Sequence, residues 1–200
     1  MPKIVDRELR RDEVLAATCE VIARDGLDSA TMRRIADEAG CTTGRITHYF
    51  AGKREILIAA LRQVHLAAAA RMSRALAGAT GLRALEAVLH EALPLDEARR
   101  REWRVWLAFW GRAPGDALLV AEQRRRYAEW SALVTTLLRA AARSGELRPG
   151  PAVAVRVDGI LALIDGLGLQ ATLEPERLPA ARQRALVTVH LDGLRPPTWT

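Results

Sequence analysis

Apolar residues recur with the period of an α-helix along the whole sequence, and no segment alternates apolar and polar residues as a β-strand does. Glycine and proline interrupt the pattern and mark the helix ends. Together these features predict an all-α chain of about nine helices. The expected helices are one through Val14–Ile22 that stops at Asp25-Gly26, then Thr31–Ala39, Thr43–Phe50, Lys53–Ala77, one through Leu82–Leu93, Arg99–Ala113, Ala117–Ser144, Ala152–Leu173 and Pro179–Gly193.

The second and third expected helices are much shorter than those that follow them. Short helices cannot enclose a large core, so residues 1–52 are expected to form a small N-terminal domain on a larger C-terminal domain, residues 53–200. No stretch rich in Ser, Pro or Gly separates the two, because a long helix is expected to begin at Lys53. A movement in the larger domain would therefore reach the smaller one as a rigid displacement.

Several classes of protein are excluded by the composition. The longest strongly apolar stretch, Gly159–Leu169, is broken by Asp165 and is far shorter than the ~20 residues of a membrane span. The charged N-terminus lacks an apolar secretory core, so we expect a cytoplasmic protein without a membrane partner. Two cysteines give neither a disulfide framework nor zinc spacing, and no cofactor or metal is expected. No nucleophile–base pair, HExxH motif or glycine-rich phosphate loop is present, so no enzyme is expected.

The net charge of +6 suggests a polyanionic partner, but most of this positive charge does not lie in the small N-terminal domain. Residues 1–54 contain ten basic and nine acidic side chains, so most of the excess lies in the larger domain. Locally the balance differs, because Cys41–Arg54 contains Arg45, Lys53 and Arg54 and no acidic residue. This segment is the better candidate for contact with an anion.

Residues 33–50 have the spacing of a helix-turn-helix motif. Ala36 is small enough for a second helix to cross closely, and Gly40 can adopt the positive φ that a tight turn needs. Ile46 is then the apolar residue that holds the second helix against the first. The small core is expected to include Ile35, Ala39 and Phe50, and the exposed face of the second helix Thr42, Thr43, Arg45, Thr47 and His48.

The segment Thr31–Lys53 resembles the TetR family of bacterial transcriptional repressors. The matching residues are Gly26, Thr31, Ile35-Ala36, Glu38-Ala39-Gly40, Gly44, Ile46, His48-Tyr49-Phe50 and Lys53. The resemblance implies a sequence-specific DNA-binding regulator. It also implies DNA-backbone or base contacts by Thr31 and Arg33, base reading by Thr42, Thr43 and Arg45, and phosphate contacts by His48, Tyr49 and Lys53.

Two residues of the predicted DNA-binding face, Thr47 and Tyr49, are open to a second interpretation. Many members of the family carry a tyrosine where this chain has Thr47, which implies a weaker phosphate contact there. Tyr49 could instead be mostly a core residue with its hydroxyl at the rim. Arg45 is the best candidate for specificity, since an arginine reads guanine with two hydrogen bonds.

Aromatic residues gather in the first part of the larger domain. Trp103, Trp106 and Trp110 share one helix face with Phe109 beside them, and Tyr127 and Trp130 are three residues apart on the next helix. Such a stripe is either packed core or the lining of a pocket for a quaternary ammonium or a flat apolar molecule.

The region Trp103–Glu174 also resembles the choline-responsive branch of the family, notably in Asp165-Gly166-Leu167-Gly168-Leu169-Gln170. Asp158 and Asp165 lie on one face of an otherwise apolar helix, and a buried acid needs a partner. That partner would be a cationic ligand or an arginine, such as Arg156 or Arg182, at a subunit interface.

The resemblance as a whole implies a homodimeric repressor. The two copies would pair through Ala152–Leu173 and Pro179–Gly193 and place recognition helices in major grooves ~34 Å apart on a pseudo-palindromic operator. A small inducer, cationic or aromatic and apolar, would release the DNA. The alternative is a DNA-binding regulator that has no inducer.

Overall fold

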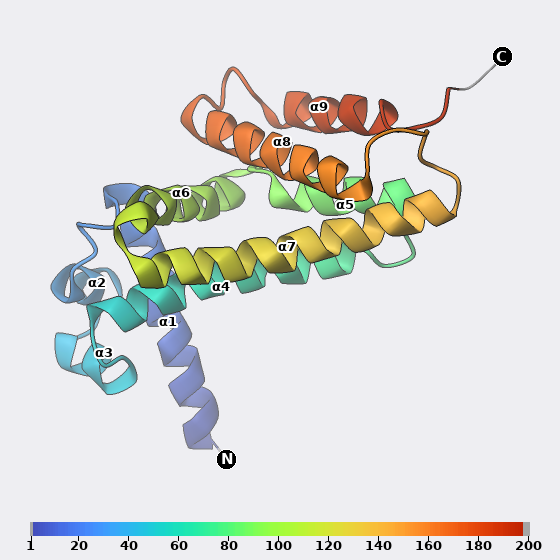
Figure 1. Ribbon diagram of the computed structural model, residues 1–200. Coiled ribbons are helices and arrows are strands. Elements are labelled where there is room, and N and C mark those ends of the chain that lie inside the picture. Colours follow the sequence, from blue (N-terminus) through green and yellow to red (C-terminus); the bar gives the residue numbers. More distant parts are fainter. Residues whose placement is uncertain (1, 198–200) are drawn as a thin grey trace. The chain divides into compact units, whose positions relative to one another are not determined.

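The computed structural model describes the backbone of residues 2–197 and the side chains of residues 8–197 (Figure 1). Within that range the chain is entirely helical, with nine α-helices, one short 3-10 turn and no strand, which confirms the predicted fold class. The helices are α1 (Pro2–Asp25), α2 (Met32–Glu38), α3 (Thr43–Tyr49), α4 (Lys53–Ala75), α5 (Gly81–Ala92), α6 (Glu97–Arg112), α7 (Ala117–Arg143), α8 (Val153–Leu173) and α9 (Ala180–Asp192), with the 3-10 turn η1 at Ala113–Gly115.

The chain divides into two compact units, which are described separately. One unit is Met1–Ala67 with Arg100–Leu119, and the other is Ala68–Arg99 with Val120–Thr200. The division falls inside α4, α6 and α7, so each of these helices has residues in both units. The functional boundary expected between residues 52 and 53 is a different division, and it stays a prediction.

Helices α1, α2 and α3 form the small core of the first unit (Figure 1). Ile22, Ile35, Ile46 and Phe50 are almost completely buried, as the spacing of the motif predicts. Ala39 is only half-buried, because it caps the end of α2, where the chain turns outward. Burial of these side chains is what holds α2 and α3, since helices of seven residues are not stable alone.

The turn between α2 and α3 depends on Gly40. Its φ is +61°, the left-handed conformation that glycine adopts at little cost. The Gly40 N–H donates to Asp37 O at 3.2 Å and the Cys41 N–H to Ala36 O at 2.9 Å, the pair of bonds that ends a helix in a Schellman motif. The positive φ expected from the sequence is confirmed.

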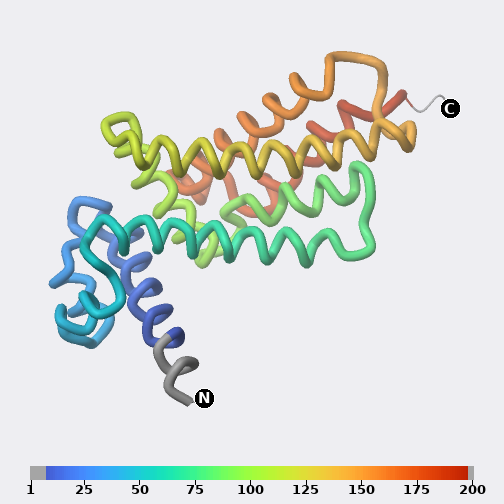
Figure 2. Tube along the Cα trace, turned by 60° about the horizontal axis from the view of Figure 1, so that its bottom comes forward, coloured from blue at the N-terminus to red at the C-terminus, as the bar shows by residue number. Residues whose placement is uncertain are grey.

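In the second unit, α5 packs against α9 (Figure 2). The leucines predicted as the apolar stripe of α5 and its end, Leu82, Leu85, Leu89 and Leu93, are all fully buried. The contact includes a hydrogen bond of 2.6 Å that Thr188 Oγ1 donates to Glu86 Oε1.

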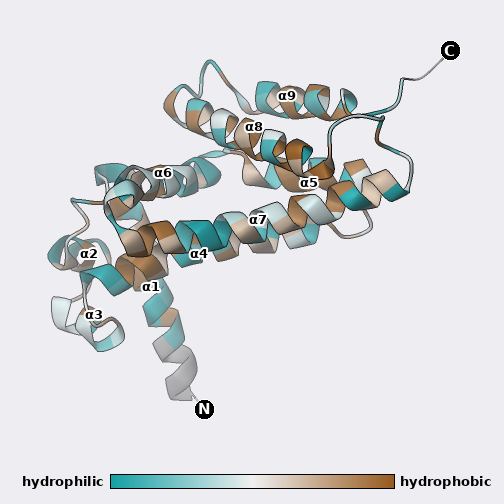
Figure 3. Cartoon of the chain, in the orientation of Figure 1, coloured by the Kyte–Doolittle hydropathy of each residue, from teal (hydrophilic) through white to brown (hydrophobic). Residues whose placement is uncertain are grey.

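Helix α8 is the most apolar of the long helices (Figure 3). Val157, Ile160 and Ile164 are buried, whereas Val155 and Leu173 are well exposed. No helix in the described part of the chain is long and apolar enough to cross a membrane.

Candidate nucleic-acid interface

Helix α3 presents the face that was predicted to read DNA. Thr42, Thr43, Arg45, Thr47 and His48 are all exposed, while Ile46 between them is buried. Short hydroxyl side chains and one arginine on a solvent-facing helix can approach base edges in a major groove. All nine residues predicted to contact DNA belong to the first unit, so the fold brings them together in one compact body.

Thr31 and Thr42 begin the two helices of the motif. Thr31 Oγ1 accepts a hydrogen bond from the Arg34 N–H at 3.2 Å, and Thr42 Oγ1 accepts one from the Arg45 N–H at 3.3 Å. Each hydroxyl therefore satisfies a backbone donor at a helix N-terminus and keeps its own proton for a second partner. A threonine at these positions can stabilise the helix and donate to a DNA phosphate at the same time.

The side chains near the C-terminal end of α3 are partly engaged in contacts within the protein. The Thr47 hydroxyl donates to Gly44 O at 3.0 Å, so its proton is used within the helix, and the weak phosphate contact expected there stays a prediction. Tyr49 is half-buried, and its ring packs edge-to-face on His48 with centroids 5.3 Å apart. Part of the Tyr49 side chain is thus covered by packing within the protein.

Two cationic residues flank the motif. Arg33 is exposed on α2, and Lys53 begins α4. Lys53 Nζ donates to Asp28 O at 3.3 Å, which fixes the ammonium group beside the α1–α2 connection. An ammonium has more donors than this single bond uses, so Lys53 can also bind a phosphate oxygen.

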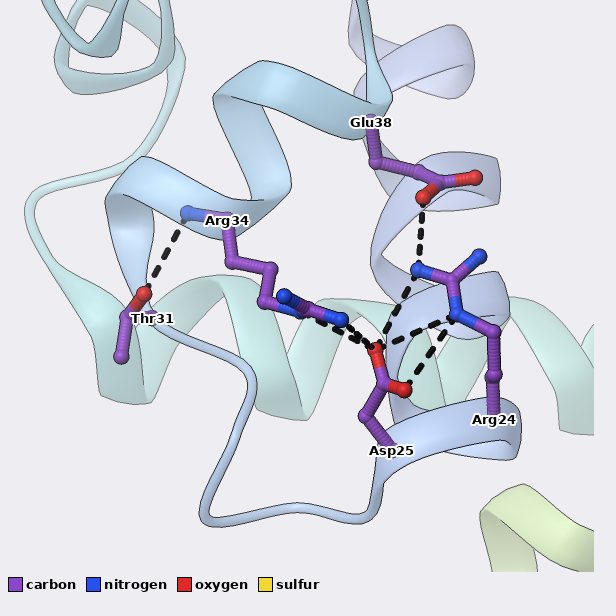
Figure 4. A network of polar contacts seen from close by, with 5 residues as sticks. All are labelled: Arg24, Asp25, Thr31, Arg34 and Glu38. Carbon is purple, nitrogen blue, oxygen red and sulfur yellow. Dashed lines mark hydrogen bonds and ion pairs between the residues drawn. The ribbon is translucent and has the colours of Figure 1, made fainter.

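A network of charged side chains joins the end of α1 to both ends of α2 (Figure 4). Arg34 donates to Asp25 Oδ2 through Nε and Nη2, at 3.0 and 2.8 Å. Arg24 bridges Asp25 and Glu38, with 2.7 Å between its Nη2 and Glu38 Oε2. Exposed ion pairs contribute little stability singly, but together these orient α2 on α1.

The arginines also set the charge of the network. Hydrogen bonds from Arg34 and Arg24 hold the pKa of Asp25 below its ordinary value, and the bond from Arg24 does the same for Glu38. Both acids therefore remain ionised at neutral pH. The guanidinium groups of Arg24 and Arg34 are neutralised within the network, so the unpaired positive charge needed for DNA must come from elsewhere on the motif.

The aromatic residues of α6 lie in the first unit. Trp103, Trp106 and Phe109 are buried, and Trp103 packs edge-to-face with both Trp106 and Trp110 at centroid distances of 5.2 and 5.7 Å. His65 of α4 lies 5.6 Å from the Trp106 ring. Within the described part of the chain, Trp106 Nε1 is buried and has no hydrogen-bond partner.

The other predicted ligand residues, Tyr127, Trp130 and Asp165, lie in the second unit. The Tyr127 hydroxyl, on α7, donates a hydrogen bond to the Asp165 carboxylate on α8. Burial raises the pKa of both groups. Within this chain the partner of Asp165 is therefore a tyrosine, and Arg156 donates to Pro151 O and Arg148 O; an arginine at a subunit interface stays a prediction. That all seven residues line one pocket stays a prediction.

Comparisons with known proteins decide the family. Residues 14–60 match the family of bacterial regulatory proteins called the tetR family, and residues 81–196 match the C-terminal domain of the BetI-type transcriptional repressors. The chain belongs to the TetR family. It is a DNA-binding transcriptional regulator with a BetI-type C-terminal domain, as the residues of the motif predicted.

The similarity to curated TetR-family proteins extends over the whole chain. The HTH-type transcriptional regulator BetI 2 of Chromohalobacter salexigens is 33% identical over 97% of this chain and 92% of its own length. The regulator BetI of Vibrio parahaemolyticus is 32% identical over 96% of this chain and 95% of its own length.

Solved structures of transcriptional regulators agree with the fold. A transcriptional regulator from a Rhodococcus species superposes with a TM-score of 0.81 and 30% identity, covering 92% of this chain and 95% of its own. A regulator from Saccharomonospora viridis, solved in complex with choline, gives a TM-score of 0.86 at 24% identity, covering 94% and 98%. The second likeness concerns the fold alone.

Sequence reasoning located the exposed face of this TetR motif but missed the charges that frame it. The partners Arg34 and Asp25 are nine residues apart, and Arg24 and Glu38 are 14 apart. No helical spacing relates such pairs, because each joins two different helices. The signal in the sequence was one arginine and one acid at the end of the first helix, Arg24 and Asp25, and one of each on the next, Arg34 and Glu38.

Proposed function

We propose that the protein is a homodimeric repressor that acts in the cytoplasm and leaves its operator when a small cation binds the C-terminal domain, residues 53–200. The observation that carries the DNA-binding part is the exposed polar face of α3, with Arg45 at its centre and Ile46 buried beneath it. Residues 1–52 act as the DNA-binding domain. Two such faces would read successive major grooves of a pseudo-palindromic operator.

The proposed dimer interface is the outer face of α8 and α9. Val155, Leu169 and Leu173 of α8 and Leu186 and Val189 of α9 are exposed large apolar residues on neighbouring helices. On α8 they recur at intervals of 14 and four residues, which places them on one face. A second copy related by two-fold symmetry would cover this face with its own.

The proposed inducer site centres on Asp165. Asp165 is half-buried, and within the described residues its partner is a tyrosine hydroxyl rather than a positive charge, which a cationic ligand would supply. In the first unit, the buried N–H of Trp106 has no acceptor within the described residues, and a polar ligand atom there would satisfy it. Aromatic faces and one acid are the groups that recognise a quaternary ammonium.

The proposed signal travels through α4. This helix is unbroken from Lys53 to Ala75, so a displacement of its C-terminal part would move Lys53 and with it the motif. To empty an occupied operator almost completely, the inducer would have to favour the released form by ~5.5 kcal/mol.

A regulator without an inducer is the second candidate. Trp103 and Phe109 are buried and Trp103 packs edge-to-face with two neighbouring tryptophans, which is ordinary core packing. In that case the aromatic residues stabilise the protein and bind nothing.

Binding to a duplex from upstream of the gene tests the DNA-binding part. Arg45→Ala should weaken binding by ~1–3 kcal/mol and relax specificity at one position, while Lys53→Ala should weaken it on all sequences and lower the salt slope by about one. Arg74→Ala removes an exposed arginine of α4 outside the motif and serves as the control. The assignment is wrong if Arg45→Ala and Lys53→Ala bind that duplex as tightly as the wild type.

Thermal unfolding with a panel of quaternary ammonium and flat apolar compounds tests the inducer site. A compound that binds the native state raises Tm, and Asp165→Asn should abolish the rise for cations. Asp158→Asn is the matched control, because Asp158 is an exposed acid on the same helix. If no compound shifts Tm, or if both variants respond alike, the regulator without an inducer is the better description.

A further inference from the structure

A second carboxylate–arginine contact lies beside the proposed phosphate-binding lysine. Arg54, the residue after Lys53, donates from Nη2 to Asp116 Oδ1 at 2.6 Å. Asp116 precedes α7, and both residues belong to the first unit. The partners are 62 residues apart, so this contact exists only because of the tertiary fold.

Arg54 is placed where an anion is favoured. It occupies the first turn of α4, where the helix dipole disfavours a positive charge and attracts a negative one. An anion beside basic residues at a helix N-terminus offsets this unfavourable interaction, which is ~0.3–1 kcal/mol for each exposed charge. In this structure Asp116 supplies that negative charge for Arg54, and Lys53 bonds to a neutral carbonyl oxygen.

Asp116 is held in place independently of Arg54. The same oxygen, Oδ1, also accepts the backbone N–H groups of Leu118 at 3.0 Å and Leu119 at 3.3 Å. Burial acts to raise the pKa of Asp116, but these N–H groups and Arg54 outweigh it and hold the pKa below its ordinary value. The carboxylate therefore keeps two backbone hydrogen bonds when Arg54 leaves it.

Arg54, by contrast, is free to exchange partners. Its side chain is 59% exposed, against 26% for Asp116. The two line a cleft of about 280 Å³ with Lys53, Phe109 and Arg112, so the guanidinium has open space beside it. Carboxylate and phosphate offer an arginine the same kind of charge-assisted bonds, and Arg54 cannot make both fully at once.

We propose that Asp116 competes with DNA phosphate for Arg54 and thereby lowers the DNA affinity of the protein. Arg54 is then a second phosphate-binding residue beside Lys53. Asp116, at the N-terminus of α7, determines how often the Arg54 guanidinium is available to bind phosphate. This inference rests on the proposed function, because it takes the start of α4 to face DNA.

The test is Asp116→Asn, which removes the charge and keeps the cap, since asparagine caps helices as well as aspartate. Asp96→Asn is the matched control. Asp96 likewise accepts a backbone N–H, from Arg99 at 2.8 Å, and pairs with the same arginine at 3.1 Å, but it precedes α6 and belongs to the second unit. Both variants gain one unit of net charge.

Binding is measured on a duplex of random sequence across a salt series, because phosphate contacts supply essentially all of such binding. With Arg54 released, Asp116→Asn should bind more tightly than Asp96→Asn and lose affinity with salt more steeply, by up to about 0.9 in the log–log slope. Such a slope difference is about threefold between 50 and 200 mM salt. In an Arg54→Gln background, Asp116→Asn should have no effect beyond that of Asp96→Asn.

Three results would overturn the proposal. The first two are equal binding by Asp116→Asn and Asp96→Asn, and a gain from Asp116→Asn that persists in the Arg54→Gln background. Weaker binding by Asp116→Asn would show that the ion pair positions α4 instead and would also reject competition. The proposed function fails separately, through the Arg45→Ala result on the upstream duplex.

Discussion

Replacing Ile46 with alanine should release α3 from the protein while leaving its exposed face chemically unchanged. Ile46 is completely buried, and α3 has only seven residues, far below the ~12–15 at which an isolated helix becomes even marginally stable. Loss of the side-chain carbons costs about 2.4 kcal/mol at ~0.8 kcal/mol for each one removed. With the cavity that remains, the total should be about 3 kcal/mol, within the range of ~2–5 kcal/mol for such truncations.

Amide hydrogen exchange measures this loss where it occurs. The amides of α2 and α3 should exchange faster in Ile46→Ala, by the factor that corresponds to about 3 kcal/mol, and binding to upstream DNA should weaken. Ile46→Val should give a graded effect of ~0.5–1.5 kcal/mol. Thr47→Ala, on the exposed face of the same helix, is the control and should change stability by less than about 0.5 kcal/mol.

The reasoning would be refuted if Ile46→Ala cost less than about 1 kcal/mol, or if Thr47→Ala cost as much as Ile46→Ala. Either result would mean that α3 is not held by the buried isoleucine. The positions of Thr42 and Arg45 on the exposed face would then need another explanation.

Three further predictions follow from single contacts. Gly81→Ala should lower Tm, because φ is +60° and the new Cβ would lie 1.8 Å from Glu146 Oε1, whose carboxylate caps α5; the left-handed conformation alone costs ~1–2 kcal/mol. Burial raises the pKa of Asp165 in the folded protein above its ordinary value of 3.8, so the folded state is stabilised by the protonated acid and loses that stability as pH rises from 3.8 through the folded-state pKa. Urea unfolding should therefore show the free energy of unfolding of the wild type falling relative to that of Asp165→Asn over this pH interval. A difference between the two proteins that does not change with pH would contradict this prediction. Burial raises the pKa of Cys19 to about 12, so a thiol reagent at pH 8 should modify half-buried Cys41 first and Cys19 only after unfolding, as mass spectrometry of peptides would show.

Most of the fold could be predicted from the sequence because its determinants are local. The start of α2 at the capping residue Thr31, its end near Gly40 and the start of α4 at Lys53 all follow from residue types at fixed spacing. The burial of Ile46 beneath an exposed face follows from the helical period. Helix α1 begins at Pro2, well before the apolar pattern that starts at Val14. The other ends differ from expectation by at most a few residues, for example at Ala75 rather than Ala77 for α4, because the last turn of a helix is set by weak competing bonds.

The chemistry of the site could be predicted only in part. The sequence identified Arg45 and Lys53 as candidates for DNA contact, and it singled out Asp165 as an acid in need of a partner. It did not identify Tyr127 as that partner, although the sequence resemblance had placed both residues in the ligand set. The helical period defines a face and does not say which helix covers it.

The sequence by itself therefore determined the helices, the motif and the family, because caps, turns and apolar spacing act between residues close together in the chain. Only the tertiary structure decided which charges meet. The pairs Arg34–Asp25 and Arg54–Asp116 each join different helices, and their ionic bonds depend on how those helices pack. Helix packing is fixed by the sum of many small apolar contacts, which no single spacing in the sequence records.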